Sequence, residues 1–221
     1  MKKIYVTNHY NFVDQIVTNK RQEICNLINK KLNGEYFLDA LDIGSTNDTE
    51  NKSSNYLIKN IKKVKFYKSI SNQKITSSFF SQKLKKSIID NFTKQEIKLM
   101  KSDLVVSNAT IEHVGNFKNQ KKMIKNILLL TRKKFILTTP NRYHPIDFHT
   151  KLPFIHWFPK EIHRNILKIL KLDFFSKEEN LNLLCKSELI KLVEDTGIRN
   201  YKIFDISLYG FKSNYILIGV M

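Results

Sequence analysis

A single acidic residue and a single glycine stand at the end of the apolar run at residues 37 to 44. Asp42 and Gly44 form the sequence Asp-Ile-Gly, and the next four residues, 45 to 48, are all polar. A pyrophosphate site needs several backbone N–H groups in a glycine-rich turn, which this stretch lacks. One carboxylate beside one glycine instead favours a ligand that carries a positive amino group and approaches the backbone closely.

Residues 140 to 164 are the second stretch whose side chains could take part in binding or catalysis. They contain all four prolines, the only tryptophan and four of the six histidines. The histidine spacings of five, seven and seven residues suit no compact metal motif and no cysteine lies nearby, so no metal site is predicted. The mixture of aromatic and hydrogen-bonding side chains favours a substrate pocket or lid over the alternative, in which the segment only packs over the sheet. The predicted substrate-binding residues are Arg142, His144, His149, His156 and Trp157.

The elements that must position these residues alternate between strands and helices. Apolar residues at helical spacing predict a helix over 14–32, which Asn33-Gly34 ends. Further helices are predicted at 50–61, 118–130 and 176–198, and strands at 36–44, 63–71, 102–108 and 133–141, with a terminal antiparallel hairpin from 201–207 and 214–221. This order predicts a Rossmann-like α/β fold: a mainly parallel sheet with helices on both faces, in a three-layer sandwich with an antiparallel C-terminal strand.

Ligands of such sheets bind outside the carboxyl ends of the strands, so the strand ends carry the functional information. S-adenosylmethionine has the required amino group. The segments "LDIGS", "SDLVVSNATIEHVGN" and "FILTTPNR" resemble the first, fourth and fifth strand motifs of the class I S-adenosylmethionine-dependent methyltransferases, in particular their small type 11/12 members. The resemblance covers about residues 35 to 221. It implies one methyltransferase domain over 1–221, with an N-terminal helical cap at 1–34 and a substrate-binding insertion at 141–175.

The resemblance also implies roles for individual residues. Glu112 and His113 match the "EH" pair that faces donor or acceptor, with His113 as the candidate base. At the second strand end, neutral residues stand where the family usually has an acidic residue for the ribose. The implied S-adenosylmethionine-binding residues are Asp42, Gly44, Ser45, Thr46, Ser71, Asn72, Asn108 and Ala109.

The function expected from these features is methyl transfer from S-adenosylmethionine to a small-molecule or glycan-type acceptor. Two alternatives stay open: an RNA methyltransferase, and a non-catalytic binding protein that has kept the fold and lost the donor. The formal net charge of +18 invites the RNA alternative. However, the charge comes from 33 lysines against five arginines and is spread along the chain, which favours a solvated basic surface over a dedicated nucleic-acid face.

The sequence also bears on location. No apolar run approaches the roughly 20 residues that span a bilayer, and polar residues interrupt any signal-like segment behind Met1, so a cytoplasmic protein is expected. Peripheral membrane contact through the basic amphipathic stretch at 164–175 stays open. Cys25 and Cys185 lack the spacing of a zinc or redox motif and are expected to be buried.

Overall fold

The computed structural model describes residues 11–47 and 54–221, and its centre is a seven-stranded sheet in the order β3-β2-β1-β4-β5-β7-β6. The first five strands run parallel, while β7 runs antiparallel to both β5 and β6. The strands are β1 (Phe37–Ile43), β2 (Val64–Ser71), β3 (Gln82–Lys85), β4 (Ser102–Asn108), β5 (Thr131–Pro140), β6 (Tyr201–Leu208) and β7 (Phe211–Val220).

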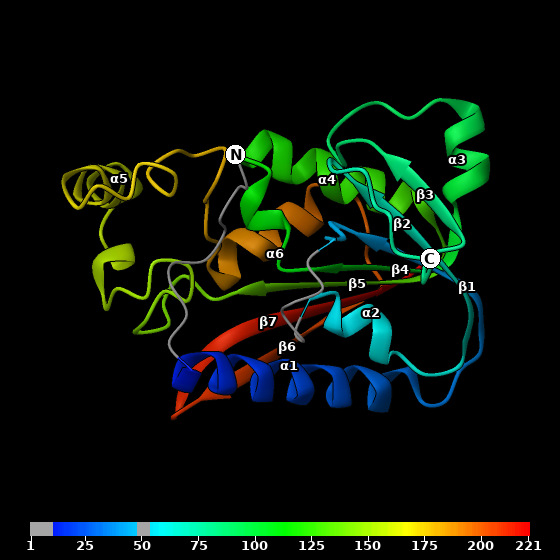
Figure 1. Cartoon of the computed structure of the whole chain (residues 1–221), viewed down its shortest axis with the longest axis horizontal. Coiled ribbons are helices and arrows are strands. Elements are labelled where there is room, and N and C mark those ends of the chain that lie inside the picture. Colours follow the sequence, from blue (N-terminus) through cyan, green and yellow to red (C-terminus); the bar gives the residue numbers. More distant parts are fainter. Residues whose placement is uncertain (1–10, 48–53) are drawn as a thin grey trace.

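Helices cover both faces of the sheet (Figure 1). One face packs against α1 (Asn11–Leu32) and α2 (Tyr56–Asn60), and the other against α3 (Lys94–Met100), α4 (Phe117–Leu130) and α6 (Lys186–Glu194). Strand β4 shows how the sequence supplies both cores, because Leu104 and Val106 face the α1 side and Val105 the α4 side. The Rossmann-like three-layer α/β sandwich with its antiparallel C-terminal strand is therefore confirmed.

Several local predictions were wrong or incomplete. Of the helix predicted over 176–198, only α6 is helical, because the residues before it are tied to the sheet region: Leu184 bridges to Asn141, and the Asn182 N–H donates to the Glu112 carbonyl at 2.7 Å. Strand β3 and helix α3 had not been predicted. Of the helix predicted over 50–61, only Tyr56–Asn60 is seen; residues 50–53 lie outside the described ranges.

The segment after β5 extends beyond the carboxyl ends of the parallel strands, where α5 lies at the far left of Figure 1. It contains a short 3-10 helix, η2 (Ile155–Trp157), and α5 (Lys160–Ile169). The basic amphipathic stretch at 164–175 is therefore helical only as far as Ile169. Leu167, Phe175, Leu181 and Leu183 form a small core of their own. Across 11–47 and 54–221, no helix has the length and apolar character needed to cross a membrane.

Candidate active site

Asp42 is a buried carboxylate in the second-last residue of β1, with only 5% of its surface exposed. Its Oδ2 accepts a hydrogen bond from the Ser45 hydroxyl at 2.5 Å, and no ion pair to it is found among the described residues. Burial raises the pKa of Asp42 to about 6, against the opposing effects of the Ser45 hydrogen bond and the positive charge of Lys59. At neutral pH the group is thus mainly a buried anion that a bound cation would stabilise.

Polar side chains, in place of further glycines, hold the turn after β1. The Ser69 hydroxyl donates to the Ser45 Oγ at 2.8 Å, and the Ser71 hydroxyl donates to the Ser45 carbonyl at 2.8 Å. The Asn47 amide reaches the Lys74 carbonyl at 2.6 Å. These bonds fix the turn to β2 and to the loop that follows it, which explains why the polar sequence after Gly44 still forms a defined turn.

Thr46 and Asn72 complete the predicted donor residues at these two strand ends. The Thr46 backbone N–H donates to Asn55 Oδ1 at 3.0 Å, and the Asn55 amide donates back to the Thr46 carbonyl at 2.8 Å. Asn72 directly follows β2 and is exposed. The Ser71 hydroxyl beside it donates within the turn and accepts from the Gln73 N–H at 3.2 Å. One lone pair of Ser71 and the exposed side chains of Asn72 and Gln73 therefore remain to hydrogen-bond a ribose at this strand end.

Gly44 is required by the close approach of two strand ends. Its φ is +91°, and a Cβ at this position would lie 2.5 Å from Thr110 Oγ1. The backbone of Ala109 is also in the left-handed region, with φ +49°, and its N–H donates to the Thr138 carbonyl at 3.0 Å. The Thr138 hydroxyl donates to Asn108 Oδ1 at 2.6 Å. The residues predicted from the first and fourth motifs therefore meet at one edge of the sheet.

Glu112 is fully buried in the 3-10 helix η1 (Ile111–His113) that follows β4. The Thr139 hydroxyl at the end of β5 donates to Glu112 Oε2 at 3.1 Å. Glu112 Oε1 has no hydrogen-bond partner in the described part of the chain, and His149 Nε2 lies 3.9 Å from it. Burial raises the pKa of Glu112, although the charge of His149 opposes this effect.

His113 and His149 pack edge to face beside Glu112, with ring centroids 4.9 Å apart. The His113 Nδ1 lies 2.6 Å from the Asn180 carbonyl, and burial together with the charge of His149 lowers the pKa of His113 to about 3. His149 behaves in the opposite way. Burial alone would lower its pKa, but the hydrogen bond and negative charge of Asp147, 3.0 Å from Nδ1, raise it overall. The site thus pairs a neutral imidazole with one that readily holds a proton.

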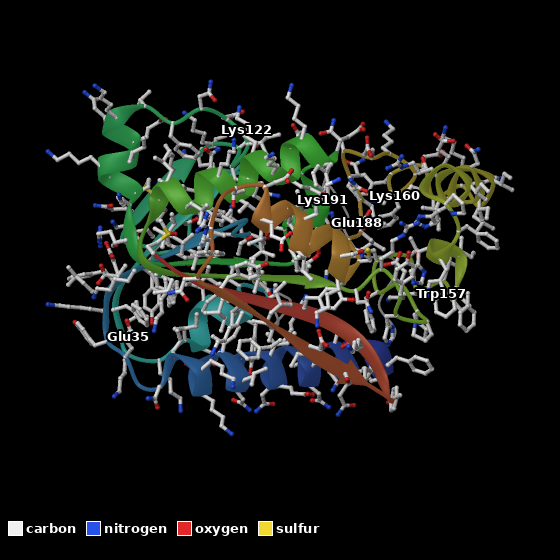
Figure 2. The ribbon with its side chains drawn as sticks, turned by 180° about the vertical axis from the view of Figure 1, so that it is seen from behind. Glu35, Lys122, Trp157, Lys160, Glu188 and Lys191 are labelled. Atoms are coloured by element: carbon white, nitrogen blue, oxygen red, sulfur yellow. The ribbon has the colours of Figure 1, made fainter. Side chains whose placement is uncertain are left out.

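The other predicted substrate residues form a separate hydrogen-bonded group. The Arg142 Nε donates to the His156 carbonyl at 3.1 Å, while His156 Nε2 and Trp157 Nε1 both lie within hydrogen-bond distance of the His144 carbonyl, at 2.6 Å and 3.2 Å. Trp157 is 42% exposed and lies at the outer end of the molecule, beside α5 (Figure 2). Of the five predicted residues, His149 is the one that contacts Glu112 and His113 at the strand ends. The hydrogen bonds of the other four fix the path of the segment after β5.

Sequence reasoning missed the partners that orient this cluster. Asp147 is two residues before His149, and a carboxylate so close to a histidine was a usable signal. Thr139 was visible as a strand-end residue, but its bond to Glu112 depends on the pairing of β4 with β5. Nothing in the sequence pointed to the Asn180 carbonyl, because that contact joins residues far apart in the chain.

No protein-family model matches this sequence, and no curated protein matches it. Solved structures do resemble it. Magnesium protoporphyrin IX methyltransferase from Synechocystis PCC 6803 with bound S-adenosylhomocysteine has a TM-score of 0.56 at 14% identity, over 99% of this chain and 91% of the other. The 1,6-didemethyltoxoflavin-N1-methyltransferase of Burkholderia thailandensis, with 1,6-didemethyltoxoflavin and S-adenosylhomocysteine bound, is also similar. Its TM-score is 0.55 at 9% identity, over 94% of this chain and 80% of the other.

A third similar structure is an O-methyltransferase family protein from Burkholderia thailandensis, with a TM-score of 0.52 at 9% identity, over 94% of this chain and 57% of the other. At these identities the likeness concerns the fold. The chain has the fold of the class I S-adenosylmethionine-dependent methyltransferases, as the sequence motifs predicted.

Proposed function

We propose that the protein is an S-adenosylmethionine-dependent methyltransferase that acts on a small-molecule or glycan-type acceptor. The observation that carries this proposal is Asp42, a buried carboxylate with a raised pKa and no ion-pair partner in the described chain, next to Gly44. It lies where β1 separates β2 from β4, the switch point at which open α/β sheets bind ligands. A strongly perturbed group in that place is typical of a binding site.

The donor would lie across the carboxyl ends of β1, β2 and β4. Asp42 would bind the amino group of its methionine part, and the glycine next to it would allow close approach. Asn108 and Ala109 would lie beneath the reactive sulfonium. The remaining proposed contacts come from Gly44, Ser45, Thr46, Ser71 and Asn72. Similar structures that contain S-adenosylhomocysteine support this choice of donor.

The acceptor would bind near Glu112, His113 and His149, beyond the sulfonium. Its nucleophilic atom attacks the methyl carbon, the carbon–sulfur bond breaks, and the bonding electrons stay on sulfur. Where the nucleophile is a hydroxyl, its proton must leave. His113 is the candidate base that the sequence motif indicates, but burial and the charge of His149 lower its pKa to about 3, so its neutral imidazole is a weak base. Most of the rate enhancement would come from positioning the two reactants in line.

The same proposal covers the whole chain as one methyltransferase domain, with α1 as part of a helical cap over 1–34 and residues 141–175 as the substrate-binding insertion. Residues 1–10 of that cap lie outside the described ranges. The network of Arg142, His144, His156 and Trp157 would then shape the insertion and the outer wall of the acceptor site.

Two measurements test the proposal. Isothermal titration of S-adenosylmethionine into the purified protein should show one binding site, and incubation with methyl-labelled donor should transfer label to at least one member of a panel of hydroxylated small molecules and glycans. Donor binding without transfer to any acceptor, RNA included, would favour a non-catalytic binding protein. Absence of donor binding in the folded protein would refute the proposal.

A further inference from the structure

We propose that Glu112, His113 and His149 bind a divalent transition-metal ion. Each of the three offers one ligand atom, and these atoms lie within 4.8 Å of one another. Two ligands come from the 3-10 helix after β4 and the third from the segment after β5. The sequence had predicted no metal, but that prediction considered only the histidines of one segment.

Each of these three side chains is oriented by a second partner. Thr139 holds one oxygen of Glu112, the Asn180 carbonyl holds His113 Nδ1, and Asp147 holds Nδ1 of His149. A histidine that donates one ring nitrogen to a carboxylate while the other faces a metal is a recurring arrangement in metal sites. Here the other nitrogen of His149, Nε2, faces Glu112 Oε1.

The unpartnered oxygen of Glu112 is the second, independent observation. Glu112 has no exposed surface, and its Oε1 accepts no hydrogen bond from the described residues. An unsatisfied buried acceptor is destabilising, and more so when it is charged. A cation between Oε1 and the imidazoles would remove this penalty, because it would give Oε1 the close partner that His149 Nε2, at 3.9 Å, does not provide.

The distances are compatible with a small ion after modest movement. Ligand atoms about 2.1 Å from a metal lie roughly 3 to 3.5 Å apart in tetrahedral or octahedral geometry. Glu112 Oε1 and His149 Nε2 are 3.9 Å apart, so an ion would draw these two atoms together by roughly half an ångström. All three ligand atoms lie within 4.8 Å of one another, so the most widely spaced pair would approach by up to about 1.5 Å.

The ligand set indicates which metals fit. Two imidazoles and one carboxylate suit Zn²⁺, Fe²⁺, Co²⁺ or Mn²⁺ better than Mg²⁺ or Ca²⁺, which prefer oxygen ligands. Three protein ligands leave coordination positions open to water or to an acceptor oxygen. The role of the ion in orienting that oxygen rests on the proposed methyltransferase function, whereas metal binding itself does not. While the ion is bound, His113 is one of its ligands, so the proton of a hydroxyl acceptor would leave to a base other than His113.

Cobalt(II) is a suitable probe because bound cobalt has visible absorption bands that report imidazole ligation. Chelator-treated full-length protein, titrated with cobalt chloride alone, should bind one equivalent and develop these bands. Glu112→Gln and His149→Asn should each lower the cobalt affinity at least 100-fold, whereas Asp147→Asn, which removes only the orienting carboxylate, should lower it by roughly tenfold to 100-fold. His163→Asn removes a buried histidine outside the cluster and should leave the affinity unchanged.

Circular dichroism establishes that each variant is folded, and titration of S-adenosylhomocysteine into the same samples separates the two proposals. Wild-type protein that is folded but binds no cobalt, or cobalt binding that Glu112→Gln and His149→Asn leave intact, would overturn the metal site. Cobalt binding without S-adenosylhomocysteine binding would refute the proposed donor and leave the metal site standing. If instead S-adenosylhomocysteine binds and cobalt does not, the metal site is refuted and the proposed donor site is not.

Discussion

Replacing Asp42 with asparagine should make the protein more stable and a poorer donor binder. Burial raises the pKa of Asp42 from its ordinary value of 3.8 to about 6. A group whose pKa is raised by folding stabilises the protein at low pH, and that contribution is lost as the pH rises through the folded-state pKa. At about 1.4 kcal/mol per unit, ionisation of Asp42 lowers the free energy of unfolding by roughly 3 kcal/mol in total, of which about 2.5 kcal/mol falls between pH 4 and pH 8.

Asparagine has nearly the same shape and can still accept the Ser45 hydrogen bond, but it carries no charge. Asp42→Asn should therefore exceed the wild type in stability by up to about 3 kcal/mol at pH 8, and the difference should shrink towards pH 4. Urea unfolding followed by circular dichroism at pH 4, 6 and 8 measures the free energy of unfolding of the wild type and of the variant. Equal stability at pH 8, or a difference that grows on acidification, would show that the charged form of Asp42 is not destabilised by burial.

Asp39 on the same strand provides a matched control. It is also buried, and burial alone would raise its pKa, but hydrogen bonds from Lys68, the Asp103 N–H and Arg132 lower it overall. Asp39→Asn removes the charge from this ion-pair network and should destabilise the protein at pH 8. Both substitutions replace a buried aspartate of β1 by asparagine. If the free energy of unfolding rises for Asp42→Asn and falls for Asp39→Asn, the difference is due to the ion pair that Asp42 lacks within the described part of the chain.

Asp42→Asn should also weaken S-adenosylmethionine binding by roughly 2 kcal/mol, or about 30-fold, because the amino group loses a charged partner. Calorimetric titration at pH 8 measures this. Within the wild type, affinity should fall as the pH drops below about 6 and Asp42 becomes protonated.

Three further predictions concern other parts of the chain. Gly44→Ala should destabilise the protein by roughly 2–4 kcal/mol in urea unfolding, because its Cβ would clash with Thr110; Gly210→Ala, with a similar φ but open space around it, should lose only about 1 kcal/mol. Trp157→Ala should raise the KM for the acceptor and leave donor affinity unchanged, and a large fall in melting temperature without that kinetic defect would mean that Trp157 only packs. Duplex or transfer RNA should bind weakly and dissociate at moderate salt, and tight, sequence-dependent binding at about 0.2 M salt would favour the RNA alternative.

The sheet was largely predictable because its central strands are buried on both faces and read as continuous apolar runs. β4, with Leu104, Val105 and Val106, is an example. β3 was missed because it is a short edge strand with the sequence Gln-Lys-Leu-Lys, which carries no such signal. The helix predicted before α6 failed because tertiary contacts of Asn182 and Leu184 override local helical spacing.

The site was predictable in part for a related reason. Asp42, Gly44 and Asn108 could be placed because they end strands, and the ends of parallel strands meet at one edge. The contact of Glu112 with His149 could not, since it depends on the path of an irregular segment after β5. The hydroxyl groups of Ser69 and Ser71 donate to Ser45 and hold the turn in place of further glycines; these bonds likewise depend on the register between β1 and β2.

The proposed donor site is best tested by a crystal structure with S-adenosylhomocysteine, through the distance from the ligand's amino nitrogen to the Asp42 carboxylate. We expect this nitrogen to lie within hydrogen-bond reach of Asp42, about 3 Å directly or through one water, with the sulfur beside Asn108 and Ala109 and facing Glu112 and His113. A ligand bound away from the end of β1, with Asp42 still buried and without a cationic partner, would contradict it.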